Sequence, residues 1–233
     1  ATVKARRLVP ERAMTCVVVY GREPIAGRAK TRLAASIGDE AAADLYRVLL
    51  ARSIHEAVST GFHVVLALSG KPGVAWQPPS GVALEIQRGV DLGERLRNTF
   101  DRCFSEGWSR VIVVGSDCPA MTADHIRSAA TALERSDAVV GPAEDGGYWL
   151  IGQRTPGTDL FTGIPWSSDA TMEATRNRLR DAGVSWSEVE RLSDVDTIED
   201  LRRALASETL GDKLRADLGA VISGVEGYHG PRG

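Results

Sequence analysis

The chain has 233 residues, a net charge of −3 and a pI near 5.9, so no global positive field would draw it to nucleic acid or to an anionic membrane. Its three cysteines are far apart in sequence, which favours neither a disulfide framework nor a zinc site. No apolar run approaches the roughly 18 residues that a membrane span needs. We therefore expect a cytoplasmic protein that binds neither nucleic acid nor membrane, with an oligomer possible.

Strand and helix patterns alternate between residues 14 and 206, which predicts βαβ units and a mostly parallel sheet. We expect one three-layer α/β/α domain over 14–206, with a loose leader at 1–13, for which a targeting helix is the alternative. Residues 207–233 are expected to hold a short helix and a flexible tail. The predicted strands are 15–20, 62–68, 83–87, 110–114 and 137–140, and the predicted helices are 40–58, 92–104, 123–134 and 169–181. The Pro and Gly content of 71–81 indicates a loop.

A basic loop, residues 21–33, follows the first predicted strand. Its glycines, Gly21 and Gly27, would let backbone N–H groups approach an anion, and a helix starting near Lys30 would add the positive end of its dipole. The loop matches neither the Walker A pattern nor Gly-x-Gly-x-x-Gly. A solvated charged turn is the alternative, but the position after the first strand favours phosphate binding. Its four cations are Arg22, Arg28, Lys30 and Arg32.

The most telling segment is 111–119, in which four apolar residues of a buried strand are followed by Asp117 and Pro119. This order places a carboxylate at the carboxyl edge of the sheet, where open α/β proteins bind ligands. Aspartate is an oxygen ligand suited to Mg²⁺, which usually also holds substrate phosphates. Alternatively, Asp117 caps the helix that begins near Thr122, or closes a turn.

A second acidic cluster is formed by Asp194, Asp196, Glu199 and Asp200. Acidic residues favour the first turn of a helix, so Asp196 could be an N-cap. If Asp196 instead lies opposite Asp117, the two carboxylates could share a cation with substrate phosphates.

Residues 141–152 contain a sharp Asp-Gly-Gly turn between two strand-like segments. A plain hairpin explains the glycines, whereas a substrate-facing loop also explains the acidic and aromatic residues beside them. On the second interpretation, the residues facing the substrate are Asp145, Gly146, Gly147 and Tyr148.

Six motifs in order give the chain a resemblance to a known family. They are the Pro-Ile-Ala-Gly-Arg-Ala-Lys-Thr-Arg-Leu-Ala loop, the Asp-Leu-Gly-Glu-Arg-Leu run from Asp91, Gly-Ser-Asp-Cys-Pro from Gly115, the segment 141–152, Ile-Pro-Trp-Ser from Ile164, and Asp-Val-Asp-Thr-Ile-Glu-Asp-Leu from Asp194. Over residues 14–206 the chain resembles the bacterial radical-SAM/selenodomain-associated transferases. These belong to the nucleotide-diphospho-sugar transferase superfamily, with a glycosyltransferase-A-like fold, and are related to the guanylyltransferases for 2-phospholactate and the molybdenum cofactor.

The resemblance implies roles for individual residues. Asp117 and Asp196 correspond to metal ligands, Lys30 to the phosphate-binding lysine, and Arg22 to a position where many members carry Lys. Gly93 corresponds to a position where the backbone faces the nucleobase. The Asp-x-Asp motif of many glycosyltransferases is absent, because Ser116-Asp117-Cys118 supplies one aspartate.

The leading hypothesis is nucleotidyl transfer from a nucleoside triphosphate to a small anionic acceptor, dependent on Mg²⁺ or Mn²⁺, with release of pyrophosphate. The catalytic residues would be Lys30, Arg22 and Asp117, and the metal ligands Asp117 and Asp196. The predicted nucleotide-binding residues are Gly21, Arg22, Gly27, Arg28, Lys30, Arg32, Gly93 and Ser116, and the predicted acceptor-binding residues are Asp145, Gly146, Gly147, Tyr148 and Trp166.

Two alternatives stay open. One is glycosyl transfer from a nucleotide sugar, which the dense basic loop and the missing second aspartate disfavour. The other is a nucleotide-binding protein without turnover, since a fold does not guarantee chemistry.

Overall fold

A computed structural model describes residues 14–70 and 78–225. Its centre is a seven-stranded sheet of order β3-β2-β1-β4-β6-β5-β7. The strands are β1 (Thr15–Arg22), β2 (His63–Ser69), β3 (Ala83–Ile86), β4 (Arg110–Gly115), β5 (Ala138–Pro142), β6 (Tyr148–Gln153) and β7 (Trp186–Glu188). Apart from β6, which is antiparallel to β4 and β5, the neighbouring strands pair in parallel. The predicted mixed α/β domain with a mostly parallel sheet is confirmed.

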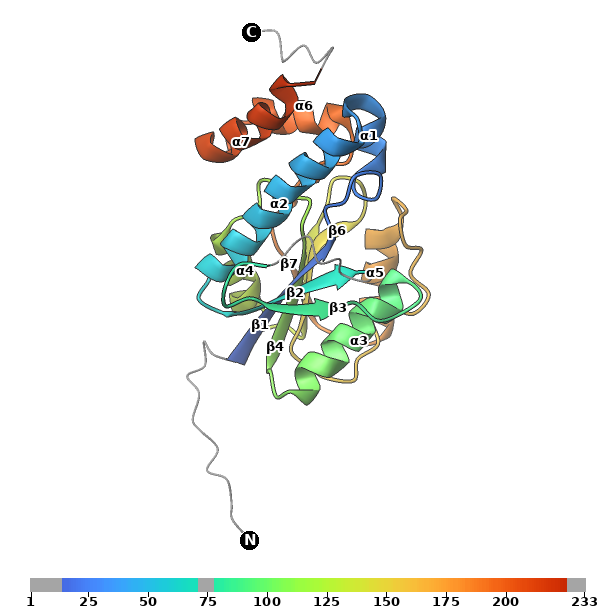
Figure 1. Ribbon diagram of the computed structural model, residues 1–233. Coiled ribbons are helices and arrows are strands. Elements are labelled where there is room, and N and C mark those ends of the chain that lie inside the picture. The colour runs from blue at the N-terminus through green and yellow to red at the C-terminus, as the bar shows by residue number, and fades with distance from the viewer. Residues whose placement is uncertain (1–13, 71–77, 226–233) are drawn as a thin grey trace.

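Helices cover both faces of this sheet (Figure 1). One face packs against α2 (Asp39–Ser59) and α4 (Ala123–Ala132), and the other packs against α3 (Leu92–Ser105) and α5 (Thr171–Asp181). Alternate residues of β1 separate into these two cores, with Val17 and Val19 on the α2 face and Cys16 and Val18 on the α3 face. This alternation explains why central strands are apolar throughout.

A third core lies beyond one end of the sheet, where α1 (Thr31–Ile37), α6 (Ile198–Ala206) and α7 (Asp212–Ser223) pack against the first turns of α2 (Figure 1). Leu33, Leu45, Leu201 and Leu218 are buried in it. The predicted C-terminal helix is α7, and the proposed domain boundary at 206 coincides with the end of α6. The domain limits themselves stay a prediction, and the expected leader 1–13, most of the loop 71–81 and the end of the tail lie outside the described residues.

The structure corrects two of the helix-capping alternatives. The N-cap of α6 is Thr197, whose hydroxyl accepts a hydrogen bond from Asp200 N while the Asp200 carboxylate accepts one from Thr197 N. The alternative of Asp196 as the cap is therefore wrong. Likewise α4 is capped by Thr122, which excludes the capping role for Asp117. Both aspartates are left available for another function.

Among the helices in the described ranges, none combines the length and the apolar character that crossing a bilayer requires.

Candidate functional site

A cleft of about 610 Å³ opens at the carboxyl ends of β1 and β4. β1 lies between β2 and β4 in the sheet, so the chain order reverses at this point. Such switch points are where open α/β sheets bind ligands, because the loops after adjacent strands diverge there. Eight of the residues predicted from sequence line the cleft: Gly21, Arg22, Lys30, Arg32, Ser116, Asp117, Trp166 and Asp196.

At the centre of the cleft, the ammonium group of Lys30 joins two aspartates that are distant in sequence. Its Nζ lies 2.6 Å from Asp196 Oδ1, to which it donates a hydrogen bond, and 3.0 Å from Asp117 Oδ1. A backbone hydrogen bond of 3.0 Å from Val195 N to Asp117 O links the two segments directly. The structure thus brings Asp117 and Asp196 together, as the second interpretation of the acidic cluster requires.

Lys30 is the buried member of this cluster, since its side chain is 5 % exposed whereas those of Asp117 and Asp196 are 40 % and 39 % exposed. Burial alone would lower the pKa of Lys30, but the nearby carboxylates of Asp117 and Asp196 outweigh burial and raise that pKa above its ordinary value. Lys30 is therefore a permanent cation that holds two carboxylates facing the cleft.

The backbone at Lys30 is left-handed, with φ of 51°. A non-glycine residue in this region is under steric strain of roughly 1–2 kcal/mol. In the described parts of the chain, Ser167 is the other non-glycine residue with positive φ, at 59°, and it lines the same cleft. Both strained residues thus belong to one site.

Tyr46, on α2, connects the ends of β1 and β4 beneath the cleft. Its hydroxyl accepts a 2.8 Å hydrogen bond from Arg22 N and lies 2.8 Å from Ser116 Oγ. Lys30 Nζ lies 5.9 Å from the centre of the Tyr46 ring. Burial raises the pKa of Tyr46, so its hydroxyl stays protonated and fixes the two strand ends.

The pair Asp117 and Asp196 fits a hard divalent cation. Asp117 Oδ1 is buried in its ion pair with Lys30, whereas the side chain as a whole is 40 % exposed and lines the cleft, so the other carboxylate oxygen is the one accessible to a ligand. Within the described residues, no group of three or more His, Cys, Asp or Glu side chains could hold a metal ion. Mg²⁺ commonly takes one or two carboxylates and completes its shell with phosphates and water, which matches this donor set.

Four predicted nucleotide-binding residues line the cleft in addition to Lys30: Gly21, Arg22, Arg32 and Ser116. The side chain of Arg32 is 72 % exposed and lies 3.9 Å from Asp196, so its charge is accessible to a ligand. Gly27 and Arg28 belong to the turn before α1, where Arg28 N donates to Ile25 O, and they do not line the cleft. A nucleotide-binding role for these two residues stays a prediction.

Trp166 lines the cleft and packs closely against Gly93 behind it. A Cβ atom at Gly93 would lie 2.8 Å from Trp166 Nε1, so the indole can occupy its position because residue 93 is glycine. Tyr148 packs edge-on against the Trp166 ring at 6.2 Å between centroids. Gly93 is buried against Trp166 and, like Tyr148, is not part of the cleft lining. The structure therefore gives both residues a packing role, and their predicted ligand contacts are not tested.

The Asp145–Gly147 turn closes the β5–β6 hairpin beside the cleft. Asp145 Oδ1 accepts a 2.9 Å hydrogen bond from Gly147 N, and Gly146 has φ of 88°. A Cβ at Gly146 would lie 2.2 Å from the carbonyl oxygen of Asp169, which explains the glycine as a packing requirement. A smaller hollow of about 290 Å³ includes Asp145 and shares Arg32 and Asp196 with the cleft. The turn thus adjoins the cleft without lining it.

Asp194 lies in this hollow, and burial together with the charges of Asp145 and Asp196 raises its pKa to about 6. The carboxylate of Asp194 is therefore repelled by those of Asp145 and Asp196. The carboxylates of Asp117 and Asp196, by contrast, are both compensated by Lys30.

Sequence reasoning missed several residues of the site. Tyr46 was assigned only to the apolar stripe of its helix, and Ser167 gave no sequence signal. At the end of the cleft near α3, Gln87 donates to Gly21 O and Ala67 O, and Arg95 Nε donates to Gly89 O. Asp91 also lines the cleft and caps α3, a role that the Asp-Leu-Gly-Glu pattern could have indicated.

Comparison with known protein families gives a match over residues 32–168 to the model of a family described as an uncharacterised protein conserved in bacteria, DUF2064. The chain belongs to this family. The DUF2064 match includes Asp117 and Trp166, and it ends before Asp196. No association of this DUF2064 protein with radical-SAM enzymes is shown by the match, so that part of the resemblance stays a prediction. No curated protein matches the chain.

Solved structures resemble the DUF2064 chain over most of its length. A protein from Desulfovibrio desulfuricans G20, named provisionally as a nucleotide-diphospho-sugar transferase, is 29% identical with a TM-score of 0.81, covering 91% of this chain and 97% of that one. A mannose-1-phosphate geranyltransferase from Thermus thermophilus has 16% identity and a TM-score of 0.54, over 84% and 80% of the two chains. An Rv0371c homologue from Mycobacterium sp. strain JC1 has 16% identity and a TM-score of 0.52, over 92% and 99%. The two latter similarities concern the fold alone.

Proposed function

We propose that this protein is a nucleotide-dependent transferase, and specifically that it transfers a nucleoside monophosphate from a triphosphate to a small anionic acceptor. The observation that carries the proposal is the convergence of Asp117 and Asp196 on Lys30, beside a basic loop, at the switch point of the sheet. The 29% identity to the Desulfovibrio protein over nearly the whole chain supports the broader class of nucleotide-diphospho-sugar transferases.

In this reaction an oxygen of the acceptor attacks the α-phosphorus, the bond between the α-phosphorus and the bridging oxygen breaks, and pyrophosphate leaves. The protein contributes alignment and charge compensation. Arg22 and Arg32, which line the cleft, would bind the phosphates that leave as pyrophosphate. The ammonium group of Lys30 has three hydrogens and contacts two carboxylates. One hydrogen is therefore left to donate to a phosphate oxygen.

Asp117 and Asp196 would hold Mg²⁺ or Mn²⁺. When bound, the ion would neutralise charge on the phosphate oxygens. Lys30 keeps the two carboxylates close despite their mutual repulsion, and Tyr46 fixes the strand ends that carry Arg22 and Asp117. The proposed acceptor side is the Trp166 side chain, which lines the cleft, together with the turn at Asp145–Gly147, which adjoins it.

The test is pyrophosphate release from each nucleoside triphosphate, with Mg²⁺ and a panel of phosphorylated acceptors. We expect release that depends on both metal and acceptor, and its loss in Asp117→Asn. Parallel reactions contain nucleotide sugars and no triphosphate. Turnover there, without any use of triphosphate, would assign glycosyl transfer instead. Nucleotide binding without turnover in either series would assign a non-catalytic protein.

A further inference from the structure

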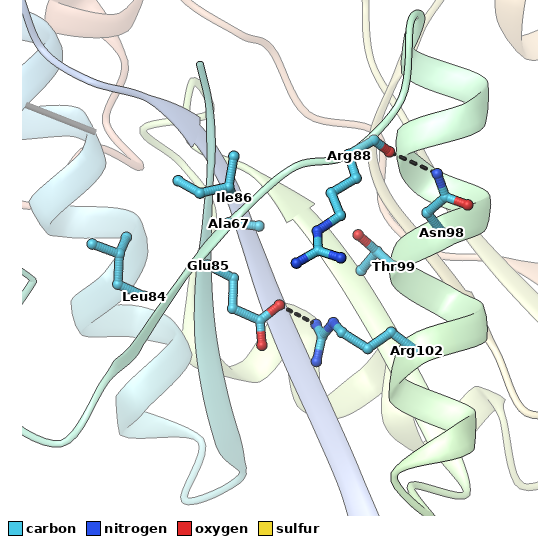
Figure 2. A pocket seen from close by; sticks show the side chains of 8 residues that line it. All are labelled: Ala67, Leu84, Glu85, Ile86, Arg88, Asn98, Thr99 and Arg102. Atoms are coloured by element: carbon cyan, nitrogen blue, oxygen red, sulfur yellow. Dashed lines mark hydrogen bonds and ion pairs between the residues drawn. The ribbon is translucent and has the colours of Figure 1, made fainter. Parts of the chain in front are cut away.

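A second cavity, of about 690 Å³, lies between the edge strand β3 and helix α3 (Figure 2). Ala67 and Glu85 line it from the sheet, and Asn98, Thr99 and Arg102 line it from the helix. None of its lining residues lines the transferase cleft, so the cavity is a separate site. Its volume is similar to that of the cleft, which is sufficient for a small organic molecule.

The cavity and the cleft share a wall. Gln87 lines the cleft, and its neighbour Arg88 lines the cavity. On α3, Arg95 lines the cleft and Thr99, one turn further, lines the cavity. The hydroxyl groups of Tyr20, a cleft residue, and Thr99 are 2.6 Å apart, so a hydrogen bond crosses this wall.

Two of the three charged side chains in the cavity compensate each other. Arg102 Nη2 lies 2.6 Å from Glu85 Oε2, and Arg102 Nη1 donates to Glu106 at 2.9 Å. Arg88 is exposed, and within residues 14–70 and 78–225 its guanidinium has no hydrogen bond or close ion pair, although its charge also acts on the Glu85 carboxylate. Figure 2 shows this guanidinium directed into the cavity, toward Thr99 and Arg102.

The backbone of Arg88 is held in place even though its guanidinium has no such partner. Asn98 Nδ2 donates a 2.8 Å hydrogen bond to Arg88 O. The next residue, Gly89, has φ of 144°, packs against the backbone of Glu94 and Arg95, and accepts from Arg95 Nε at 3.1 Å. The guanidinium therefore extends from an anchored backbone over a cavity in which Arg102 already pairs with Glu85 and with Glu106 beside the lining.

We propose that this cavity binds a small organic anion, whose carboxylate or phosphate group pairs with the guanidinium of Arg88. Arginine binds such groups through two parallel hydrogen bonds, and it is weakly hydrated compared with lysine. The lining also includes Ala67, Leu84 and Ile86, so a ligand with a short apolar part fits better than an inorganic ion. This proposal does not depend on the function of the cleft.

The experiment compares inorganic phosphate, monobutyl phosphate and butyrate as probes, by titration calorimetry and by ¹⁵N NMR of the Asn98 side-chain amide. The two organic probes separate a phosphate group from a carboxylate group. Variants are Arg88→Gln and, as a matched control, Arg135→Gln at an exposed arginine outside both cavities. Arg22→Gln separates phosphate binding in the cleft from binding at Arg88.

We expect at least one organic probe to bind more tightly than inorganic phosphate, to shift the Asn98 resonances, and to lose at least 10-fold in affinity in Arg88→Gln. Arg135→Gln and Arg22→Gln should retain that binding. The proposal is overturned if no probe shifts the Asn98 amide at millimolar concentration, or if Arg88→Gln binds every probe as the unmodified protein does.

Discussion

Asp159 and Asp117 both pair with cations. They differ in how many hydrogen bonds and ion pairs their carboxylate oxygens make with the rest of the protein. Asp159 accepts hydrogen bonds from the backbone N–H groups of Phe161 and Thr162 and pairs with Arg97 and Arg178. Burial alone would raise the pKa of Asp159, but hydrogen bonds from Thr162 and Phe161 and the charge of Arg97 lower it to about 2. This carboxylate holds the segment around residue 160 against α3 and α5.

Asp117 has a much smaller set of partners. Its Oδ1 atom is buried in the ion pair with Lys30, while its side chain as a whole is 40 % exposed and lines the cleft. A carboxylate whose oxygens accept hydrogen bonds and ion pairs from the surrounding fold is structural. A carboxylate with an accessible oxygen in a cleft can bind a ligand. Substitutions should therefore separate the two residues, with Asp159 affecting stability and Asp117 affecting ligand binding.

The largest effect is expected from Lys30→Met. This variant removes the cation between Asp117 and Asp196 and leaves two neighbouring carboxylates uncompensated. We expect nucleotide-dependent turnover to fall by at least 100-fold, and the free energy of unfolding to fall by about 1–3 kcal/mol. Enzyme kinetics and urea denaturation measure these changes.

The matched control is Arg32→Met, which removes a 72 % exposed cation 3.9 Å from the same Asp196. Its free energy of unfolding should change by less than about 0.5 kcal/mol, since exposed ion pairs contribute little. Equal destabilisation by the two substitutions would show that the buried position of Lys30 has no special importance.

An intermediate effect is expected from Asp159→Asn. Because the folded-state pKa lies below the unfolded value of 3.8, ionised Asp159 stabilises the fold above that value, and this contribution is lost as the pH falls toward 2. Solvent screens a side chain that is 36 % exposed, so we expect about 1 kcal/mol at pH 7. Urea denaturation of both proteins should show a difference that disappears between about pH 4 and pH 2.

Nucleotide binding should be unchanged in Asp159→Asn at pH 7. If that variant loses nucleotide affinity while keeping its stability, the distinction between a structural and a ligand-binding carboxylate is wrong for this pair.

The smallest effect is expected from Ser167→Gly. Glycine adopts a φ of 59° without steric cost, but it also increases the entropy of the unfolded chain. The net result should be a gain of about 0.5 kcal/mol in the free energy of unfolding, accompanied by weaker substrate binding if the strained turn holds Trp166 for function. Thermal unfolding and KM measure the two quantities.

Ser168→Gly is the comparison, because Ser168 has no positive φ and its hydroxyl accepts from Ala170 N. It should lower stability. A loss of stability in Ser167→Gly as well would mean that the turn is not strained.

Much of the fold could be predicted from sequence because the central strands and the helices carry strong periodic patterns. The run of four apolar residues before Asp117 is continuous since both faces of β4 are covered, and α3 shows its buried face in Leu96 and Phe100. β7 was missed because it has three residues and lies at the edge of the sheet. Such a strand exists through its pairing with β5, which no local pattern encodes.

The charged residues of the candidate site could be predicted from sequence, whereas the residues that position them could not. Asp117 and Lys30 stand at strand ends and in loops, where polar residues are conspicuous. The N-cap of α6 is Thr197 and not Asp196. Sequence alone could not distinguish them, because both residue types favour the N-cap position and tertiary contacts decide between them. Tyr46 has helical spacing like any core residue, and its link between Arg22 and Ser116 arises only when β1 and β4 lie side by side.

The most direct test of the central claim is Mn²⁺ binding measured by electron paramagnetic resonance, with and without a non-hydrolysable nucleoside triphosphate. The unmodified protein should bind Mn²⁺ more tightly when the nucleotide is present, and Asp117→Asn and Asp196→Asn should each lose at least 10-fold in that affinity. Asp159→Asn should behave as the unmodified protein. Retention of nucleotide-dependent Mn²⁺ binding in both cleft variants would contradict the assignment of Asp117 and Asp196 as the metal ligands.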